Sequence, residues 1–136
     1  MLEFLLAGVA RVEQTADVSL DIDNLIGELR TFADEREWDQ FHNPKNLAMA
    51  LAGEVGELLA ELQWRSPEDC ESENLTGDDR QAVEAELTDV LFYLLRLCDR
   101  LDVDLEKAVS AKLAENGRRY PVSVAKGSSA KAPRHT

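Results

Sequence analysis

The chain has 136 residues, of which 44% are hydrophobic and 31% charged, and its formal net charge is −12. This length suits one domain with a real hydrophobic core. The negative charge argues against nucleic acid or an anionic membrane surface as a partner, because both would repel the chain.

Residues 1–20 show no clear period and are expected to form an N-terminal arm of uncertain structure. Their apolar run lacks a basic leading segment and is too short to span a bilayer, so no secretion signal is expected. Cys70 and Cys98 have no metal-binding or redox spacing. We expect reduced thiols in a cytoplasmic protein.

The first two predicted helices have clear start signals. Asp21 or Asp23 can cap a helix that runs to about Trp38, with apolar residues at helical spacing. Asn43 followed by Pro44 is typical of a second start, since proline needs no hydrogen-bond acceptor at the first helical position. This second helix is expected to run to about Trp64.

A polar, acidic loop over residues 66–77 should connect two antiparallel helices, of which the second runs from about Asp78 to Arg100. Residues 90–98 of this third helix are apolar nearly all round. Such a helix must be covered on more than one side, and in a small chain the second cover is expected to be another subunit. The sequence thus predicts a homo-oligomer.

A fourth helix is expected to open at Asp104 and to end around Asn116-Gly117, a good C-terminal stop. Residues 122–136 are basic, poor in apolar residues and expected to be disordered. The predicted fold class is therefore all-α, a four-helix bundle over residues 21–121.

Two acid pairs stand out on the second and third helices. Glu54 and Glu57 lie three residues apart, as do Glu86 and Asp89, and each pair shares one helix face. A single pair of this kind is usually a solvated surface. Because both pairs border apolar stripes on neighbouring helices, they are expected to aim four carboxylates into one cleft, where a cation would relieve their repulsion.

The ligand type limits the metal. His42 and His135 are the only histidines, and neither lies on the two acidic helices, so a zinc site and a di-iron site are disfavoured. Carboxylates together with substrate phosphates suit Mg²⁺, with Mn²⁺ as a possible substitute.

The basic end of the chain could supply the groups that bind phosphate. Residues 1–103 carry 8 Lys/Arg against 24 Asp/Glu, whereas residues 104–136 carry 7 against 3. Lys112, Arg119 and their neighbours gather around the end of the fourth helix, although cations favour helix C-termini without any ligand. Trp38 and Trp64 could form a slot for a flat base, or could simply belong to the core.

These motifs resemble those of the MazG-like all-α nucleoside triphosphate pyrophosphatases, and most closely those of the dCTP pyrophosphatase branch. The likeness covers roughly residues 22–126. The matching stretches are Trp38-Asp-Gln-Phe-His-Asn-Pro-Lys-Asn-Leu47, Gly53-Glu-Val-Gly-Glu-Leu58, Gln63-Trp64, Glu86-Leu-Thr-Asp-Val-Leu-Phe-Tyr93, Val103-Asp-Leu105 and Asn116-Gly-Arg-Arg-Tyr-Pro121. Gly53 stands where MazG proper often has another glutamate, which favours the dCTP branch.

The resemblance implies a Mg²⁺-dependent hydrolase that converts dCTP, or a modified dCTP, and water to dCMP and pyrophosphate. It implies that the metal ligands and catalytic carboxylates are Glu54, Glu57, Glu86 and Asp89. The residues implied around base and sugar are Trp38, His42, Asn46, Trp64 and Tyr93. Those implied at the triphosphate are Lys112, Asn116, Arg119 and Tyr120.

Two alternatives stay open at this stage. The same fold could act on dUTP or on other modified nucleotides, because base preference depends on side-chain placement that spacing does not fix. The acidic stripe could instead belong to a non-catalytic helical module that binds a basic partner.

Overall fold

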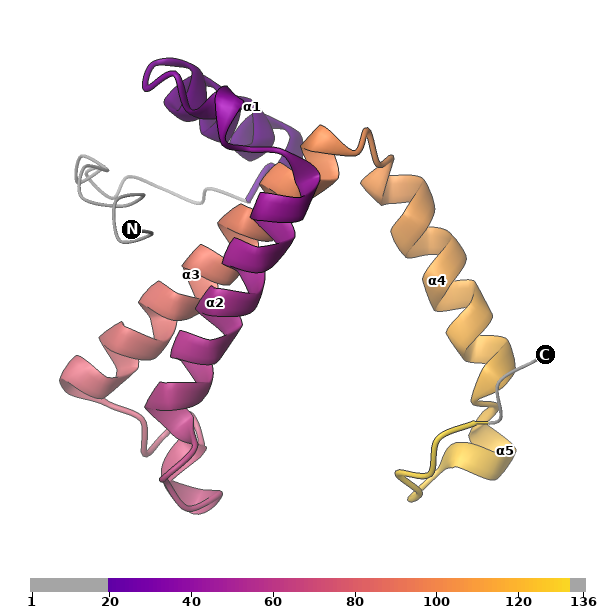
Figure 1. The fold of residues 1–136 in the computed structure, drawn as a ribbon. Coiled ribbons are helices and arrows are strands. Elements are labelled where there is room, and N and C mark those ends of the chain that lie inside the picture. The colour runs from indigo at the N-terminus through magenta and orange to yellow at the C-terminus, as the bar shows by residue number, and fades with distance from the viewer. Residues whose placement is uncertain (1–19, 133–136) are drawn as a thin grey trace. The chain divides into compact units, whose positions relative to one another are not determined.

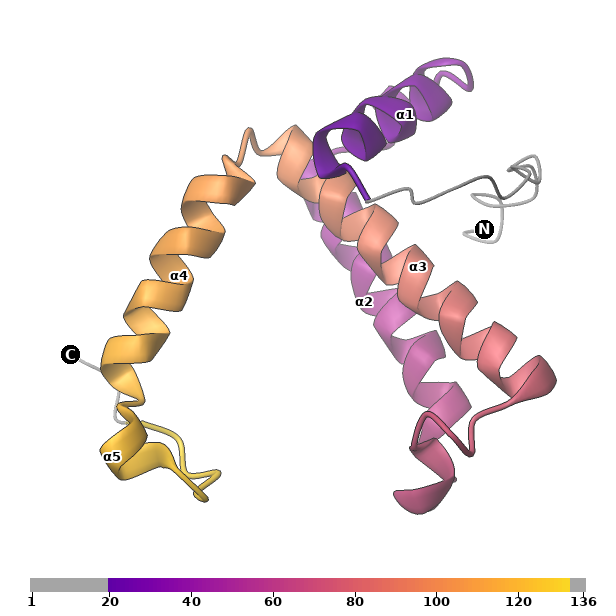
Figure 2. The same cartoon turned by 180° about the vertical axis from the view of Figure 1, so that it is seen from behind.

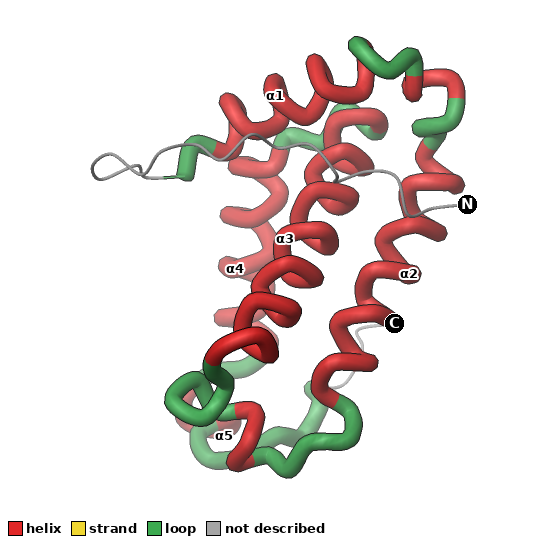
Figure 3. Tube along the Cα trace, turned by 90° about the vertical axis from the view of Figure 1, so that its left-hand side faces the viewer, coloured by secondary structure: helices red, strands yellow, loops and turns green. Residues whose placement is uncertain are grey.

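The computed structural model describes residues 20–132, in which helices connected by loops are the only regular secondary structure, with no strand among them (Figures 1 and 3). The elements are α1 (Ile22–Asp34), the short 3-10 helix η1 (Trp38–Gln40), α2 (Pro44–Leu62), the 3-10 helix η2 (Glu68–Cys70), α3 (Gly77–Arg100), α4 (Leu105–Arg119) and α5 (Val122–Ala125). The all-α prediction is confirmed. None of the described helices is long and apolar enough to cross a bilayer.

The chain divides into two compact units, the first ending at Leu101 and the second beginning at Asp102. This boundary falls inside the single domain expected over residues 21–121. Asp102 has a φ of 52°, which turns the backbone sharply, and α4 buries none of its residues. Each unit is therefore described by itself.

In the first unit, α2 and α3 run side by side as an antiparallel pair, joined by the loop that contains η2 (Figures 1 and 2). α1 packs against α3. The core of the pair consists of Leu47, Ala50 and Tyr93, with Leu51 and Leu97 packed against it. This core holds the two acidic helices at a fixed spacing.

Three of the four main helices begin where the sequence predicts, because the capping side chains form the expected hydrogen bonds. Asp21 accepts from the Asn24 backbone N–H, Asn43 from that of Asn46 and Asp104 from that of Lys107, each at 2.9 Å. Each bond satisfies an amide that the first helical turn leaves without a partner.

Helix ends differ from the prediction in two places. α1 ends at Asp34 rather than near Trp38, because Glu37 adopts a left-handed conformation with a φ of 54° and the chain turns into η1. α4 continues to Arg119, so Gly117 lies inside the helix instead of stopping it. A glycine in a helix interior costs only about 1 kcal/mol, which neighbouring residues offset.

At the start of the tail that is expected to be disordered, Val122–Ala125 form α5 immediately after Pro121. Beyond α5, the Ala132 backbone N–H donates to the Tyr120 hydroxyl at 3.3 Å. Residues 1–19 of the arm predicted over residues 1–20, and the last residues, 133–136, lie outside the described part of the chain.

Much apolar surface of the first unit stays exposed in a single chain. Leu59 of α2 and Leu87 and Leu94 of α3 are all exposed, although leucine favours burial. The apolar helix that the sequence predicts to need a second cover therefore presents leucines to solvent here.

Candidate functional site

The site begins with three carboxylates that converge across the α2–α3 pair. Glu54 and Glu57 extend from α2 and Glu86 from α3, and one oxygen from each lies within 4.8 Å of the others. On a helix, residues three apart share a face, and the antiparallel pairing brings that face opposite α3. The convergence predicted for these three residues is confirmed.

Asp89, the fourth predicted member, does not join this group of oxygens. It lies three residues after Glu86 on α3 and lines a small cavity with His42 and Tyr93. Its negative charge nevertheless acts on the cluster, since it helps to raise the pKa of both Glu54 and Glu86.

When no metal is bound, it is electrostatically unfavourable for the four carboxylates of Glu54, Glu57, Glu86 and Asp89 all to be ionised. Burial is the main cause that raises the pKa of Glu54 to about 7, and the charges of Glu57, Asp89 and Glu86 add to it. Burial, and then the charge of Glu57, also raise the pKa of Glu86 and of Asp89. The site therefore binds protons readily unless a cation replaces them.

The residues present fit a hard divalent cation. Oε2 of Glu86 is buried and has no hydrogen-bond partner among the described residues, so one ligand atom is free for a metal. All candidate ligands are carboxylates, and oxygen ligands suit Mg²⁺. A buried acceptor without a partner is costly, and a metal ion would remove that cost.

The structure places three of the predicted base-site residues together. The rings of Trp38 and His42 lie edge to face with centroids 6.0 Å apart, and His42 is buried. His42 and Tyr93 line the same cavity as Asp89. Burial first, and then the charge of Arg96, lower the pKa of His42, so the imidazole is neutral at pH 7.

The cavity itself is small. It has a volume of about 20 Å³, room for about one water molecule, and its lining residues are Leu29, Phe32, Ala33, His42, Asp89, Phe92, Tyr93 and Arg96. A nucleotide base does not fit inside it. Any base must therefore stack outside the cavity, against the exposed parts of the aromatic groups.

Asn46 and Trp64, the other two predicted base-site residues, lie at opposite ends of α2. Asn46 sits in the first turn, where its side-chain amide donates to the Phe41 carbonyl at 3.0 Å. Trp64 follows the last turn and is 89% exposed. Because α2 has 19 residues and rises 1.5 Å per residue, it spans about 28 Å between the end that carries Asn46 and the end that Trp64 follows.

The predicted phosphate-binding residues all belong to the second unit. Lys112 pairs with Glu115 at 2.9 Å, and Arg119 pairs with the same carboxylate at 3.7 Å. The Arg119 guanidinium lies over the Tyr120 ring, 5.7 Å from its centroid. Asn116 lies on the same helix, and its backbone carbonyl accepts from the Tyr120 N–H at 2.9 Å. The sequence analysis does not predict Glu115, which pairs with both Lys112 and Arg119, as a site residue.

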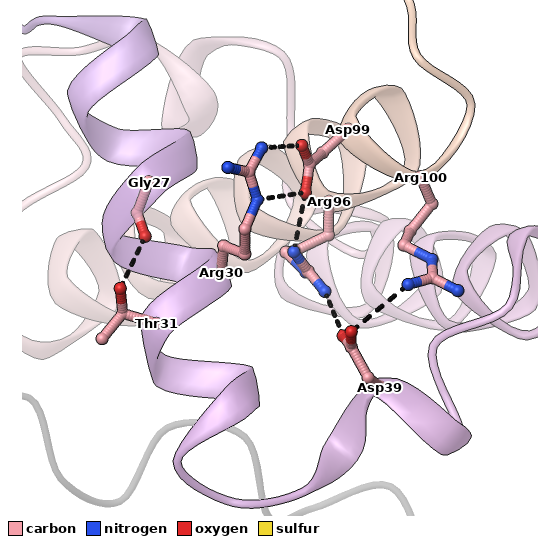
Figure 4. Close-up of polar contacts among 7 residues, drawn as sticks. All are labelled: Gly27, Arg30, Thr31, Asp39, Arg96, Asp99 and Arg100. Carbon is pink, nitrogen blue, oxygen red and sulfur yellow. Dashed lines mark hydrogen bonds and ion pairs between the residues drawn. The ribbon is translucent and has the colours of Figure 1, made fainter.

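Sequence reasoning also missed an ion-pair network beside the aromatic residues, in which Arg96 of α3 bridges Asp39 and Asp99 (Figure 4). Asp39 and Arg96 are 57 residues apart in sequence. No local spacing pattern signals such a pair.

A sequence model of the MazG-like family matches residues 50–133. The chain is 47% identical over 100 residues to proteins named dCTP pyrophosphatase 1 from Bos taurus and Homo sapiens. These matches cover 74% of this chain and 59% of each relative, so the chain spans less than two thirds of their length. A crystal structure of a pyrophosphatase from Archaeoglobus fulgidus superposes with a TM-score of 0.68 at 40% identity, covering 79% of this chain and 99% of that one.

The raised pKa of Glu54 predicts a stability that depends on pH. Between the ordinary value of 4.5 and about 7, the folded chain binds more protons at this group than the unfolded chain. The stability that this proton provides is fully present below about pH 4.5 and is lost as the pH rises through about 7. In EDTA, the Tm should therefore fall over this range.

Thermal unfolding in EDTA, in buffers between about pH 5 and 8, measures this effect. Glu54→Gln should flatten the fall, because the amide does not titrate, whereas Glu84→Gln, outside the cluster, should keep it. A Glu54→Gln variant with the same slope as the parent would show that Glu54 is not the titrating group.

Proposed function

This chain belongs to the MazG-like family, and on that premise we propose that it is a Mg²⁺-dependent nucleoside triphosphate pyrophosphohydrolase. The proposed substrate is dCTP or a modified dCTP, and the products are dCMP and pyrophosphate. The single observation that carries the proposal is the convergence of Glu54, Glu57 and Glu86 within 4.8 Å. The names of the relatives support the choice of substrate and reaction.

In the proposed site, Glu54, Glu57, Glu86 and Asp89 would hold the Mg²⁺. When bound, Mg²⁺ would supply neutralisation of phosphate charge and would make an attacking water more acidic. One of the carboxylates accepts the proton of this water, and Glu54 and Glu57 are the candidates to test first. Mn²⁺ offers similar oxygen coordination and could replace Mg²⁺.

The base and the phosphates are assigned to different parts of the chain. Trp38, His42 and Tyr93, with Asn46 at the start of α2, form the proposed base and sugar site on the first unit. The proposed triphosphate ligands are Lys112, Asn116, Arg119 and Tyr120 of the second unit. To bind phosphate, Lys112 and Arg119 must break their ion pairs with Glu115 and form new ones with the substrate oxygens, which are also anionic.

We further propose that the active enzyme is a homodimer or a homotetramer. Trp38 precedes α2 and Trp64 follows it, and the 19 residues of this helix span about 28 Å. Leu59, Leu87 and Leu94 leave an apolar surface for a second copy. A partner subunit would then supply Trp64 to the base site of the first.

The proposed reaction is tested by a panel of dCTP, 5-methyl-dCTP, dUTP and the common ribonucleoside and deoxynucleoside triphosphates, assayed for pyrophosphate with and without Mg²⁺. We expect Mg²⁺-dependent release of pyrophosphate, highest with a dCTP-type substrate. If dUTP is hydrolysed fastest, the proposed reaction stands and the proposed substrate is wrong. Absence of pyrophosphate from every triphosphate would favour a non-catalytic binding module.

Glu57→Gln should lower kcat for dCTP by at least about 100-fold, since it removes a metal ligand or the general base. Without metal, its Tm should equal or exceed that of the parent, because one repelling charge is lost. Glu84→Gln removes a carboxylate of α3 outside the cluster and serves as the matched control. Full activity in Glu57→Gln would remove this residue from the proposed site.

Sharing of the site between subunits can be tested by mixing two impaired variants. In a mixed dimer, one site combines the four carboxylates of the Trp64→Ala chain with the Trp64 of the Glu57→Gln chain, so this site carries neither substitution. The other site carries both. Co-refolding the two chains should restore up to about a quarter of the parent activity, from half the dimers with one intact site each. No recovery in dimers shown to be mixed would contradict the sharing.

A further inference from the structure

Five charged side chains of the first unit form a connected network on α1, η1 and α3 (Figure 4). Arg96 donates from Nη1 to Asp99 at 2.8 Å and from Nη2 to Asp39 at 3.0 Å. Arg30 of α1 donates through two nitrogens to Asp99, and Arg100 donates to Asp39 at 3.4 Å.

The charges in this network are unbalanced, with three arginines sharing two aspartates. Arg96 is the central member, and its side chain is only 5% exposed. A buried guanidinium without partners is unfavourable, because it loses its hydration. Asp99 already serves Arg30 as well as Arg96, so the interaction of Asp39 with Arg96 cannot be replaced from within the network.

Asp39 belongs to the turn that also carries two base-site residues. It is the middle residue of η1, directly after Trp38 and three residues before His42. The His42 backbone N–H donates to the Trp38 carbonyl at 3.1 Å and that of Phe41 at 2.8 Å, so the turn is closed. A closed turn moves as one body, and a bond to Asp39 therefore fixes both aromatic side chains.

Arg96, the partner of Asp39 in this ion pair, lines the small cavity. Arg96 follows Tyr93 by three residues on α3, and both line this cavity with His42 and Asp89. The ion pair between Asp39 and Arg96 thus connects the turn that carries Trp38 to the helix that carries Tyr93 and Asp89.

We propose that Arg96 and Asp39 are positioning residues, which tie the turn that carries Trp38 and His42 to α3 and so hold it at the place where the base of the substrate stacks. This role requires no contact of either residue with substrate or metal. The role in catalysis rests on the proposed function, whereas the positioning of Trp38 is a property of the folded chain alone.

The kinetic test uses Asp39→Asn and Arg96→Lys. Asparagine keeps the shape but loses the charge, and a lysine ammonium cannot span both aspartates as the planar guanidinium does. Each variant should raise KM for dCTP about tenfold and change kcat less than about threefold, because a stacking contact is misplaced while the carboxylates stay in position. Asp39→Glu keeps the charge and should restore most of the parent KM.

The matched control is Glu35→Gln. It also removes one carboxylate near this turn, from the pair of Glu35 with Arg36, whose atoms are 3.5 Å apart and whose Glu35 side chain is exposed. Its KM should equal that of the parent. Equal KM increases in Glu35→Gln and Asp39→Asn would attribute the effect to surface charge and overturn the proposal.

The second readout does not depend on activity. In a Trp64→Phe background, Trp38 is the only tryptophan. Asp39→Asn and Arg96→Lys should increase acrylamide quenching of Trp38 fluorescence and shift its emission to the red, at unchanged helix content by circular dichroism. Glu35→Gln should change neither property.

Unchanged Trp38 quenching in both folded network variants would overturn the positioning role. If Asp39→Asn does not fold, Arg96→Lys, which keeps the positive charge, decides the question alone. Increased quenching, together with absence of triphosphate hydrolysis by the parent chain, would support the positioning role and contradict the proposed function.

Discussion

Repulsion between carboxylates on facing helices is the constraint on which the site depends. Glu54, Glu57 and Glu86 are held within 4.8 Å by two helices whose shared core is small. Packing of Leu47, Ala50 and Tyr93 must offset this repulsion when no cation is present. Burial first, and then the neighbouring carboxylates, raise the pKa of Glu54 to about 7, and a divalent ion or a proton relieves this cost.

The sequence predicts helices and the acidic cluster well, because both depend on local spacing. Asn43 and Pro44 identify the start of α2 from chemistry within four residues. Glu54 and Glu57 share a face by helix geometry alone. An antiparallel connection through the loop over residues 63–76 is then enough to bring Glu86 to them.

The sequence fails where the outcome depends on distant residues or on backbone conformation. The left-handed Glu37 ends α1 early, although the local pattern favours a continued helix. Asp39 and Arg96 meet only after α1, η1 and α3 have packed. Trp64 is next to α2 in sequence just as Trp38 is, yet the length of that helix separates the two rings.

The second unit has a helix that buries none of its own residues. α4 has 15 residues, and Val109 and Leu113 on it are exposed. Isolated helices of this length are only marginally stable in water, and α4 buries none of its own residues in the described chain. A surface that covered Val109 and Leu113 would therefore stabilise the helix on which Lys112 and Arg119 lie.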